Sequence, residues 1–295
     1  MEIFNKQTGS YKSFDGTPIY YEVRGTGEPV VFVYGIACLM NHWHHQIRYF
    51  SSSYQTIMLD LRGHHRSLPV GDPSRLTIKD LALDLQGLLG HLKIDRAHFV
   101  GHSFGVPVLL ETYRAAPDLF RSLCFINGFA QNPIKNMFGL DVVEPFYRFV
   151  KAAYKKNPDL WNTLWRTAVD NPVSMRLAAL AGGFNLNLTH FKDIEVYARG
   201  VAHMELPIFM ALFESMMAFS AREILGQVQV PTLVIVGEND RVTPRHLQED
   251  FKNLLSNVEY LTVPYGSHCT QLDFPDFVNL KLREFFERAD KPKAP

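Results

Sequence analysis

The strongest constraint on the fold of this chain is a series of short apolar runs that alternate with a helical pattern. Residues 30–33, 56–59 and 97–100 are such runs, and each is bounded by turn-forming residues. Runs of this length are typical of strands buried on both faces of a parallel sheet. Between the last two, leucines recur at helical spacing over 81–92, with Thr77 as the expected N-cap. Strand alternating with helix predicts an α/β fold with a mostly parallel, doubly wound sheet of about eight strands.

The same pattern extends toward both ends of the chain. Residues 14–17 predict a hairpin turn before a strand at 18–23. Further expected elements are strands at 123–126, 231–236 and 260–263 and a final helix at 274–288.

A long helical stretch interrupts the strands, from about 131 to 225. Asn157-Pro158 and Asn171-Pro172 both have the form of a helix start, because Asn caps a helix and Pro loses little in its first turn. We therefore expect a core domain made of residues 1–130 and 226–295, with a helical cap, or lid, at 131–225.

A candidate nucleophile lies in Gly101-His102-Ser103-Phe104-Gly105. Gly-x-Ser-x-Gly alone would arise by chance in roughly one in ten chains of this length. Here it follows the strand at 97–100 and precedes a helix-forming run at 106–115, which is the strand–turn–helix setting of a nucleophile elbow. Glycines are expected two residues either side of Ser103, because larger side chains would clash in that turn.

The chain resembles the α/β-hydrolase superfamily over residues 12 to 288. Four motifs carry the resemblance: Val33-Tyr34-Gly35-Ile36 followed by Trp43; Asp60-Leu61-Arg62-Gly63-His64-His65-Arg66-Ser67; the elbow; and Gly237-Glu238-Asn239-Asp240-Arg241-Val242-Thr243-Pro244 with Ser267-His268. The order Ser, Asp, His is the one that this fold uses. The resemblance implies a serine hydrolase of the esterase type with a helical cap.

A serine hydroxyl needs a base to activate it, and the base needs an acid to orient it. His268 follows the strand at 260–263, and Asp240 follows the strand at 231–236. Loops at the carboxyl ends of parallel strands are where such a sheet assembles its site. We expect Ser103, Asp240 and His268 to form the catalytic triad, with Glu238 as the reserve acid.

The resemblance also implies two backbone N–H donors for an oxyanion, from Ile36 and Phe104. The loops around them depart from the family pattern at three positions. Tyr34 stands where the family usually has His, and His65 and Val106 stand where it usually has Gly or a small residue. No cofactor and no metal are implied.

Other histidines have structural interpretations. His102 adjoins the serine but should point away from it and pack. His42, His44 and His45 form a cluster that could in principle hold a metal. No carboxylate motif accompanies this cluster, so ordinary helix-start histidines are expected. His64 and His65 are expected to be structural.

Composition bears on the partners and the cellular location to expect. Lys and Arg together number 30, as do Asp and Glu, so no nucleic-acid partner is indicated. Cys38, Cys124 and Cys269 do not make a disulfide framework, which favours a reducing, cytoplasmic location. Residues 1–13 have no apolar core of a signal peptide, and no run of 18 apolar residues predicts a transmembrane segment.

The helical stretch is rich in flexible apolar side chains, which suit adaptable pockets for small molecules. It contains Trp161, Trp165 and six of the nine methionines: Met137, Met175, Met204, Met210, Met216 and Met217. Ordinary lid core accounts for at least half of these residues. The remainder favours an ester with a hydrophobic acyl or aryl group as the substrate.

The sequence thus predicts hydrolysis of carboxylic esters through an acyl-enzyme. C–C bond hydrolysis, perhydrolysis, amide cleavage and acyl transfer use a similar triad and stay open. A ligand-binding protein with negligible turnover is a further alternative. The expected partner is a small molecule, and a homodimer is an open alternative to a monomer.

Overall fold

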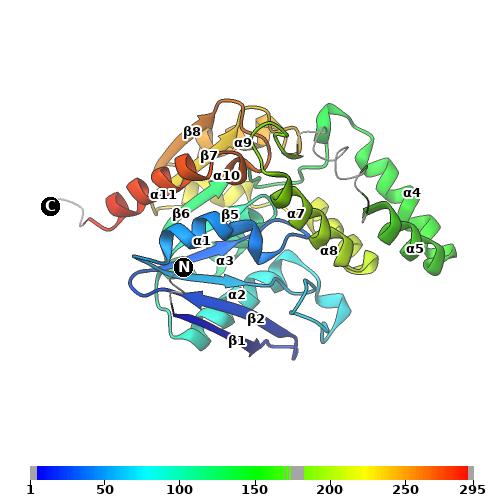
Figure 1. Ribbon diagram of the computed structural model, residues 1–295, viewed down its shortest axis with the longest axis horizontal. Coiled ribbons are helices and arrows are strands. Elements are labelled where there is room, and N and C mark those ends of the chain that lie inside the picture. Colours follow the sequence, from blue (N-terminus) through cyan, green and yellow to red (C-terminus); the bar gives the residue numbers. More distant parts are fainter. Residues whose placement is uncertain (1–4, 170, 172, 174–182, 292–295) are drawn as a thin grey trace.

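The computed structural model describes residues 5–169, 171, 173 and 183–291, and its central feature is one twisted sheet (Figure 1). The strands are β1 (Lys6–Lys12), β2 (Pro18–Arg24), β3 (Pro29–Val33), β4 (Gln55–Leu59), β5 (Ala97–His102), β6 (Phe120–Ile126), β7 (Thr232–Gly237) and β8 (Val258–Val263). Their order across the sheet is β1-β2-β4-β3-β5-β6-β7-β8. β1 pairs with β2 and β2 with β4 antiparallel, and the pairs from β4 to β8 are parallel. The predicted fold class is confirmed.

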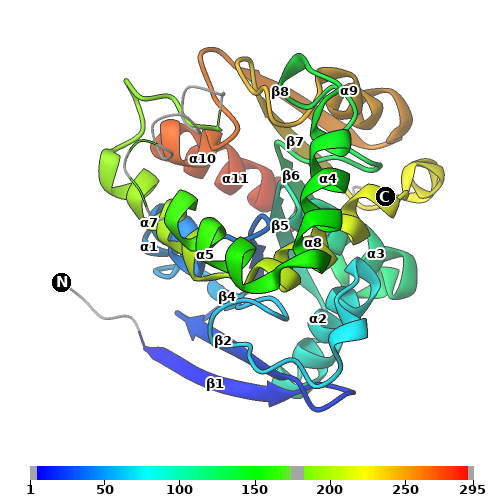
Figure 2. The ribbon, with the colours of Figure 1, turned by 90° about the vertical axis from the view of Figure 1, so that its right-hand side faces the viewer.

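Helices cover both faces of this sheet. The core helices are α1 (His44–Phe50), α2 (Ile78–Leu92), α3 (Gly105–Ala115), α9 (Arg245–Leu254), α10 (Thr270–Asp273) and α11 (Pro275–Ala289), with short 3-10 turns η1 (Met40–Trp43), η2 (Pro73–Arg75) and η3 (Pro117–Leu119). Figure 2 shows α1 and α11 on one face and α2, α3 and α9 on the other. The central strands between these helices are shielded from solvent: Val30, Val33 and Phe99 are fully buried.

Local sequence signals predicted the positions of these elements well. Thr77 caps α2, its side chain accepting a hydrogen bond from the Asp80 N–H. The predicted strands and the final helix agree with the observed ones to within a few residues. Apolar runs locate strands reliably here because both faces of a central parallel strand must be buried.

A helical insertion connects β6 to β7. Its described elements are η4 (Met137–Gly139), α4 (Val143–Lys156), α5 (Pro158–Val169), α7 (Phe191–His203), α8 (Leu206–Ala218) and η6 (Arg222–Gln227). Figure 1 shows α4, α5, α7 and α8 gathered at one end of the sheet. Asn157 caps α5 as expected, its Oδ1 accepting from the Leu160 N–H at 3.1 Å. The second predicted start, Asn171-Pro172, lies partly outside the described residues.

None of the helices in the described part of the chain is both long enough and apolar enough to cross a membrane.

Candidate active site

Ser103 lies in the tight turn between β5 and α3. Its φ of 51° is in the left-handed region, which costs a residue with a side chain about 1–2 kcal/mol. A Cβ on Gly105 would lie 2.3 Å from the Val33 carbonyl oxygen, and one on Gly101 would lie 2.9 Å from Leu109 Cδ1. Gly105 is therefore required sterically by the backbone beside it, whereas a Cβ at Gly101 would need the end of the Leu109 side chain to shift. The turn has the elbow geometry that the sequence predicted.

His268 and Asp240 form a buried pair at the ends of β8 and β7. His268 Nδ1 lies 3.1 Å from each carboxylate oxygen of Asp240. The carboxylate is itself held, because it accepts from the backbone N–H groups of Val242 and Thr243 and from the Gln248 side chain. An ionised carboxylate only accepts hydrogen bonds, so His268 carries its proton on Nδ1 and leaves Nε2 as the basic nitrogen.

The structure distinguishes Asp240 from the reserve acid. Glu238 is exposed, and its carboxylate accepts from the Tyr265 N–H at 3.2 Å rather than contacting His268. Ser103 and His268 line the same cavity, with no direct hydrogen bond between their side chains. Catalytic hydrogen bonds are often long before substrate binds. Asp240 is therefore the acid whose position fits the predicted triad.

Two backbone N–H groups near Ser103 are uncommitted. Ala37 N–H donates to His64 Nε2 and Cys38 N–H donates to the Gly35 carbonyl. Within the described residues, the N–H groups of Ile36 and Phe104 have no such partner. These are the two donors that the sequence predicted for the oxyanion.

The unusual residues Tyr34 and His65 turn out to tie the Ile36 loop to the loop after β4. The Tyr34 hydroxyl accepts from the Leu61 N–H at 2.9 Å, and His65 Nε2 lies 3.2 Å from the Cys38 carbonyl oxygen. His64 acts at the centre, with Nδ1 donating to the Arg62 carbonyl and Nε2 accepting from Ala37. The expected structural role of His64 and His65 is confirmed.

His64 also predicts acid sensitivity. Burial lowers the pKa of its imidazole from 6.5 to about 3 in the folded protein. Between these values the unfolded chain binds a proton that the folded chain excludes, so stability is lost as pH falls below about 6.5. We expect His64 to account for about 2 kcal/mol of lost unfolding free energy between pH 7 and pH 5.

Urea unfolding of wild type and His64→Gln at both pH values tests this expectation. The neutral glutamine cannot take up the proton, so its unfolding free energy should fall less between pH 7 and pH 5. An identical fall in both proteins would contradict the assignment.

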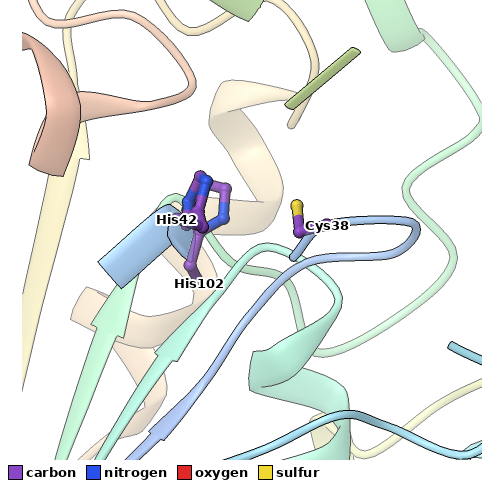
Figure 3. Close-up of side chains that lie close together, drawn as sticks. All are labelled: Cys38, His42 and His102. Atoms are coloured by element: carbon purple, nitrogen blue, oxygen red, sulfur yellow. The ribbon is translucent and has the colours of Figure 1, made fainter. Parts of the chain in front are cut away.

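His102 packs beneath the candidate base. Its ring centroid lies 4.6 Å from that of His42 and 4.9 Å from that of His268, and its Nε2 lies 2.9 Å from the His268 carbonyl oxygen. A carbonyl only accepts, so Nε2 carries the proton. Figure 3 shows the rings of His42 and His102 together, with the Cys38 sulfur across from them. His102 packs against other rings as expected and holds the backbone of His268, but it also lines the cavity that contains Ser103.

Asn127, which the sequence reasoning missed, joins the two loops that carry Asp240 and His268. Asn127 is fully buried directly after β6, with a φ of 48°. Its Nδ2 donates to the carbonyls of Ser267 at 3.1 Å and His268 at 2.6 Å, while its Oδ1 accepts from the Gly237 N–H at 2.7 Å. The only sequence signal was its place at the carboxyl end of a central strand.

We expect Asn127→Ala to lower kcat by about 10²-fold, the loss typical of a misplaced reacting group, with a smaller change in KM. It should also lower the unfolding free energy by about 1–3 kcal/mol, because buried polar groups lose their partner. Asn279→Ala, a truncation of another buried Asn on α11, is the matched control. Equal kcat values for the two variants would contradict a positioning role for Asn127.

A cavity of about 380 Å³ opens beside Ser103 and His268. Core and insertion both contribute to its largely apolar wall: Gly35, Ile36, Ala37, Cys38, His102, Phe129, Pro133, Met137, Phe138, Trp165, Ala168, Phe184, Ile194, Val201, Phe209, Phe213, Met216, Val242 and Thr243. It has the size and character of a small-molecule site.

The residues singled out in the helical stretch divide as expected between cavity and core. Met137 and Met216 line the cavity. Met204 and Met210 are buried in packing, Met217 is partly buried, and Met175 lies outside the described residues. Trp165 reaches the cavity and Trp161 packs against the core.

The three cysteines are buried and form no disulfide, in agreement with the prediction. Cys38 lines the cavity, and Cys269 packs against Phe184 and Ile194.

Comparisons with known proteins place this fold in a family. A sequence profile of the α/β hydrolase fold matches residues 28–275. The chain belongs to the α/β hydrolase fold family. This α/β hydrolase is 26% identical over 277 residues to RutD of Azorhizobium caulinodans, a candidate carbamate hydrolase, with 92% of this chain and 96% of that protein covered.

One further sequence relative and one solved structure are also similar to this chain. A non-heme haloperoxidase of Rhodococcus erythropolis is 24% identical over 305 residues, with 92% of this chain and 97% of that protein covered. The solved structure of a thermophilic esterase from Thermogutta terrifontis has a TM-score of 0.75 at 21% identity, with 97% of this chain and 100% of that chain covered, and it shows the shared fold. The family match and the hydrolase relatives identify this α/β hydrolase as an enzyme with hydrolase activity.

Proposed function

We propose that this α/β hydrolase is a serine carboxylesterase that acts on small esters with a hydrophobic acyl or aryl group. One observation carries the proposal: the cavity shared by Ser103 and His268 has an almost wholly apolar wall. Burying an acyl chain there contributes about 0.8 kcal/mol per methylene. An apolar acyl group is therefore the part of the substrate that this cavity binds best.

The proposed reaction has two halves. Ser103 Oγ attacks the ester carbonyl carbon while His268 Nε2 takes its proton, and the carbonyl oxygen gains negative charge opposite the N–H groups of Ile36 and Phe104. The C–O bond then breaks as His268 protonates the leaving alcohol, which leaves an acyl-Ser103. Water then attacks the acyl carbon while His268 takes its proton. The bond from that carbon to Ser103 Oγ breaks as His268 returns the proton to Oγ, which releases the acid and restores Ser103. Asp240 stabilises the imidazolium in both halves.

We also propose that residues 131–225 act as a lid over a core of residues 1–130 and 226–295. Ile194 from α7, with Phe209 and Met216 from α8, supplies cavity wall that the core does not provide. A bound substrate would therefore contact both core and insertion. We expect these insertion residues to determine which acyl chain lengths the cavity accepts.

Hydrolysis of p-nitrophenyl esters of increasing chain length tests the proposal. We expect kcat/KM to rise from the acetate by up to about four-fold per added methylene until the chain fills the cavity. Preference for the acetate would contradict the apolar acyl site, and absence of ester hydrolysis would contradict the function. A p-nitrophenyl carbamate in the same assay tests the chemistry for which the RutD relative is named.

Shortening the cavity should move the chain-length optimum. Met216→Trp fills the cavity wall, so the optimum is expected at a shorter acyl chain with acetate turnover kept. Met217→Trp, one residue along the same helix and outside the cavity wall, is the control. An unchanged optimum in Met216→Trp would place the acyl chain elsewhere.

A further inference from the structure

Two histidines at the start of α1 meet a carboxylate from the helical insertion. His44 Nε2 lies 3.4 Å from Asp193 Oδ1, and His45 Nε2 lies 3.4 Å from Asp193 Oδ2. One ligand atom from each of the three residues lies within 4.8 Å of the others. The side chains of His44, His45 and Asp193 are 33%, 27% and 11% exposed, so solutes can reach them. The sequence offered no nearby carboxylate because Asp193 is 148 residues from His45.

The hydrogen bond of His44 fixes which of its two ring nitrogens can bind a cation. His44 Nδ1 lies 2.9 Å from the Asn41 carbonyl oxygen, which only accepts, so Nδ1 carries a proton. In the neutral ring of His44 the lone pair of Nε2 is then directed toward Asp193, so this nitrogen and the carboxylate can bind the same cation. The ring of His45 is tilted by 40° from that of His44, with the two ring centroids 3.8 Å apart, and it faces the same carboxylate.

A divalent cation fits this arrangement. It would accept the lone pairs of both Nε2 atoms and neutralise Asp193. Two ligand atoms bound at about 2.0–2.1 Å to a tetrahedral ion lie about 3.4 Å apart, which is the separation of His44 Nε2 from Asp193 Oδ1 and of His45 Nε2 from Asp193 Oδ2. The Asn41 carbonyl supplies the outer hydrogen bond that metal-binding histidines usually make.

We propose that His44, His45 and Asp193 bind one divalent ion of the Zn²⁺ class. Imidazole and carboxylate donors suit Zn²⁺ and its first-row neighbours, and a fourth position is left for water. The ion fastens α7 of the insertion to α1 of the core. Because α7 also carries Ile194 of the cavity wall, the ion stabilises the side of the cavity that the insertion supplies. This site does not depend on the esterase proposal.

Calorimetric titration of the metal-stripped full chain with Zn²⁺ at neutral pH tests the site. Wild type is expected to bind one ion there and to unfold at a higher temperature when Zn²⁺ is present. The conservative Asp193→Asn and the double variant His44→Ala/His45→Ala should each weaken that binding by about 100-fold or more, since changes outside the ligand shell alone cost 10–100-fold. His246→Ala, which removes an exposed histidine on α9, should bind as wild type does.

A second cluster of possible metal ligands must be distinguished from the proposed site. Cys38, His42 and His102 are buried and also have ligand atoms within 4.8 Å of one another. Cys38→Ser should leave Zn²⁺ binding unchanged, and Co²⁺ bound to wild type should show no thiolate charge-transfer band. Loss of binding in Cys38→Ser, full binding in the double histidine variant, or no binding by wild type would each overturn the proposal. Circular dichroism confirms that each variant is folded.

Discussion

Replacing Ser103 with alanine is expected to reduce the kcat for ester hydrolysis by about 10⁶-fold, the loss seen when the nucleophile of a triad is removed. The substitution deletes the hydroxyl of Ser103, which lines the same cavity as the candidate base His268 and Ile36. It removes no buried hydrogen bond of the fold that the structure describes, so the unfolding free energy should change by less than about 1 kcal/mol. Kinetics with a p-nitrophenyl ester measure the first effect, and urea unfolding measures the second.

A fluorophosphonate probe provides an independent readout, because it labels only an activated serine. Wild type should be labelled and Ser103→Ala should not. Ser122→Ala is the matched control, since it truncates a buried serine on β6 that contacts His98 away from the cavity. Labelling of Ser103→Ala would place the nucleophile elsewhere. A folded wild type that resists the probe would favour the ligand-binding alternative over catalysis.

Replacing Asp240 with asparagine should lower kcat by about 10⁴-fold, the size of effect that follows a wrong imidazole tautomer in a triad. One carboxylate oxygen of Asp240 accepts from two backbone N–H groups, and the other accepts from Gln248. An asparagine that keeps its oxygen toward the backbone must turn its NH₂ toward Gln248 and His268. That NH₂ would donate to His268 Nδ1, move the proton to Nε2 and abolish the base.

Glu238→Gln is the control for Asp240→Asn, because it neutralises the neighbouring acid without touching His268. It should keep nearly full activity. The KM of Asp240→Asn should change little, since the carboxylate does not line the cavity. A larger loss in Glu238→Gln than in Asp240→Asn would reverse the assignment of the acid.

The proposed zinc site and the proposed triad would fail in different experiments. Metal binding at His44, His45 and Asp193 is read by stoichiometry and thermal unfolding, neither of which depends on Ser103. If wild type binds Zn²⁺ but hydrolyses no ester, the zinc site is supported and the esterase function is contradicted. If wild type hydrolyses esters but binds no Zn²⁺, the esterase function is supported and the zinc site is contradicted.

The sequence by itself determined the parts of this protein that depend on local pattern. Central parallel strands must be apolar on both faces, so residues 30–33 and 97–100 could be recognised without a structure. The elbow around Ser103 was equally local, because a left-handed serine between two glycines is a matter of five adjacent residues. Asp240 and His268 followed from their places just beyond predicted strands, since the carboxyl ends of parallel strands share one edge.

Only the tertiary structure decided which polar side chains hold the site in place. Asn127 bridges loops more than 100 residues away, and His64 meets Ala37 through a single hydrogen bond. Asp193 reaches His44 and His45 from α7 of the insertion. Such contacts depend on direction and distance in space and leave no periodic trace along the chain. Hydrophobic burial recurs along the central strands and therefore leaves a pattern in the sequence, whereas each of these polar contacts is made once.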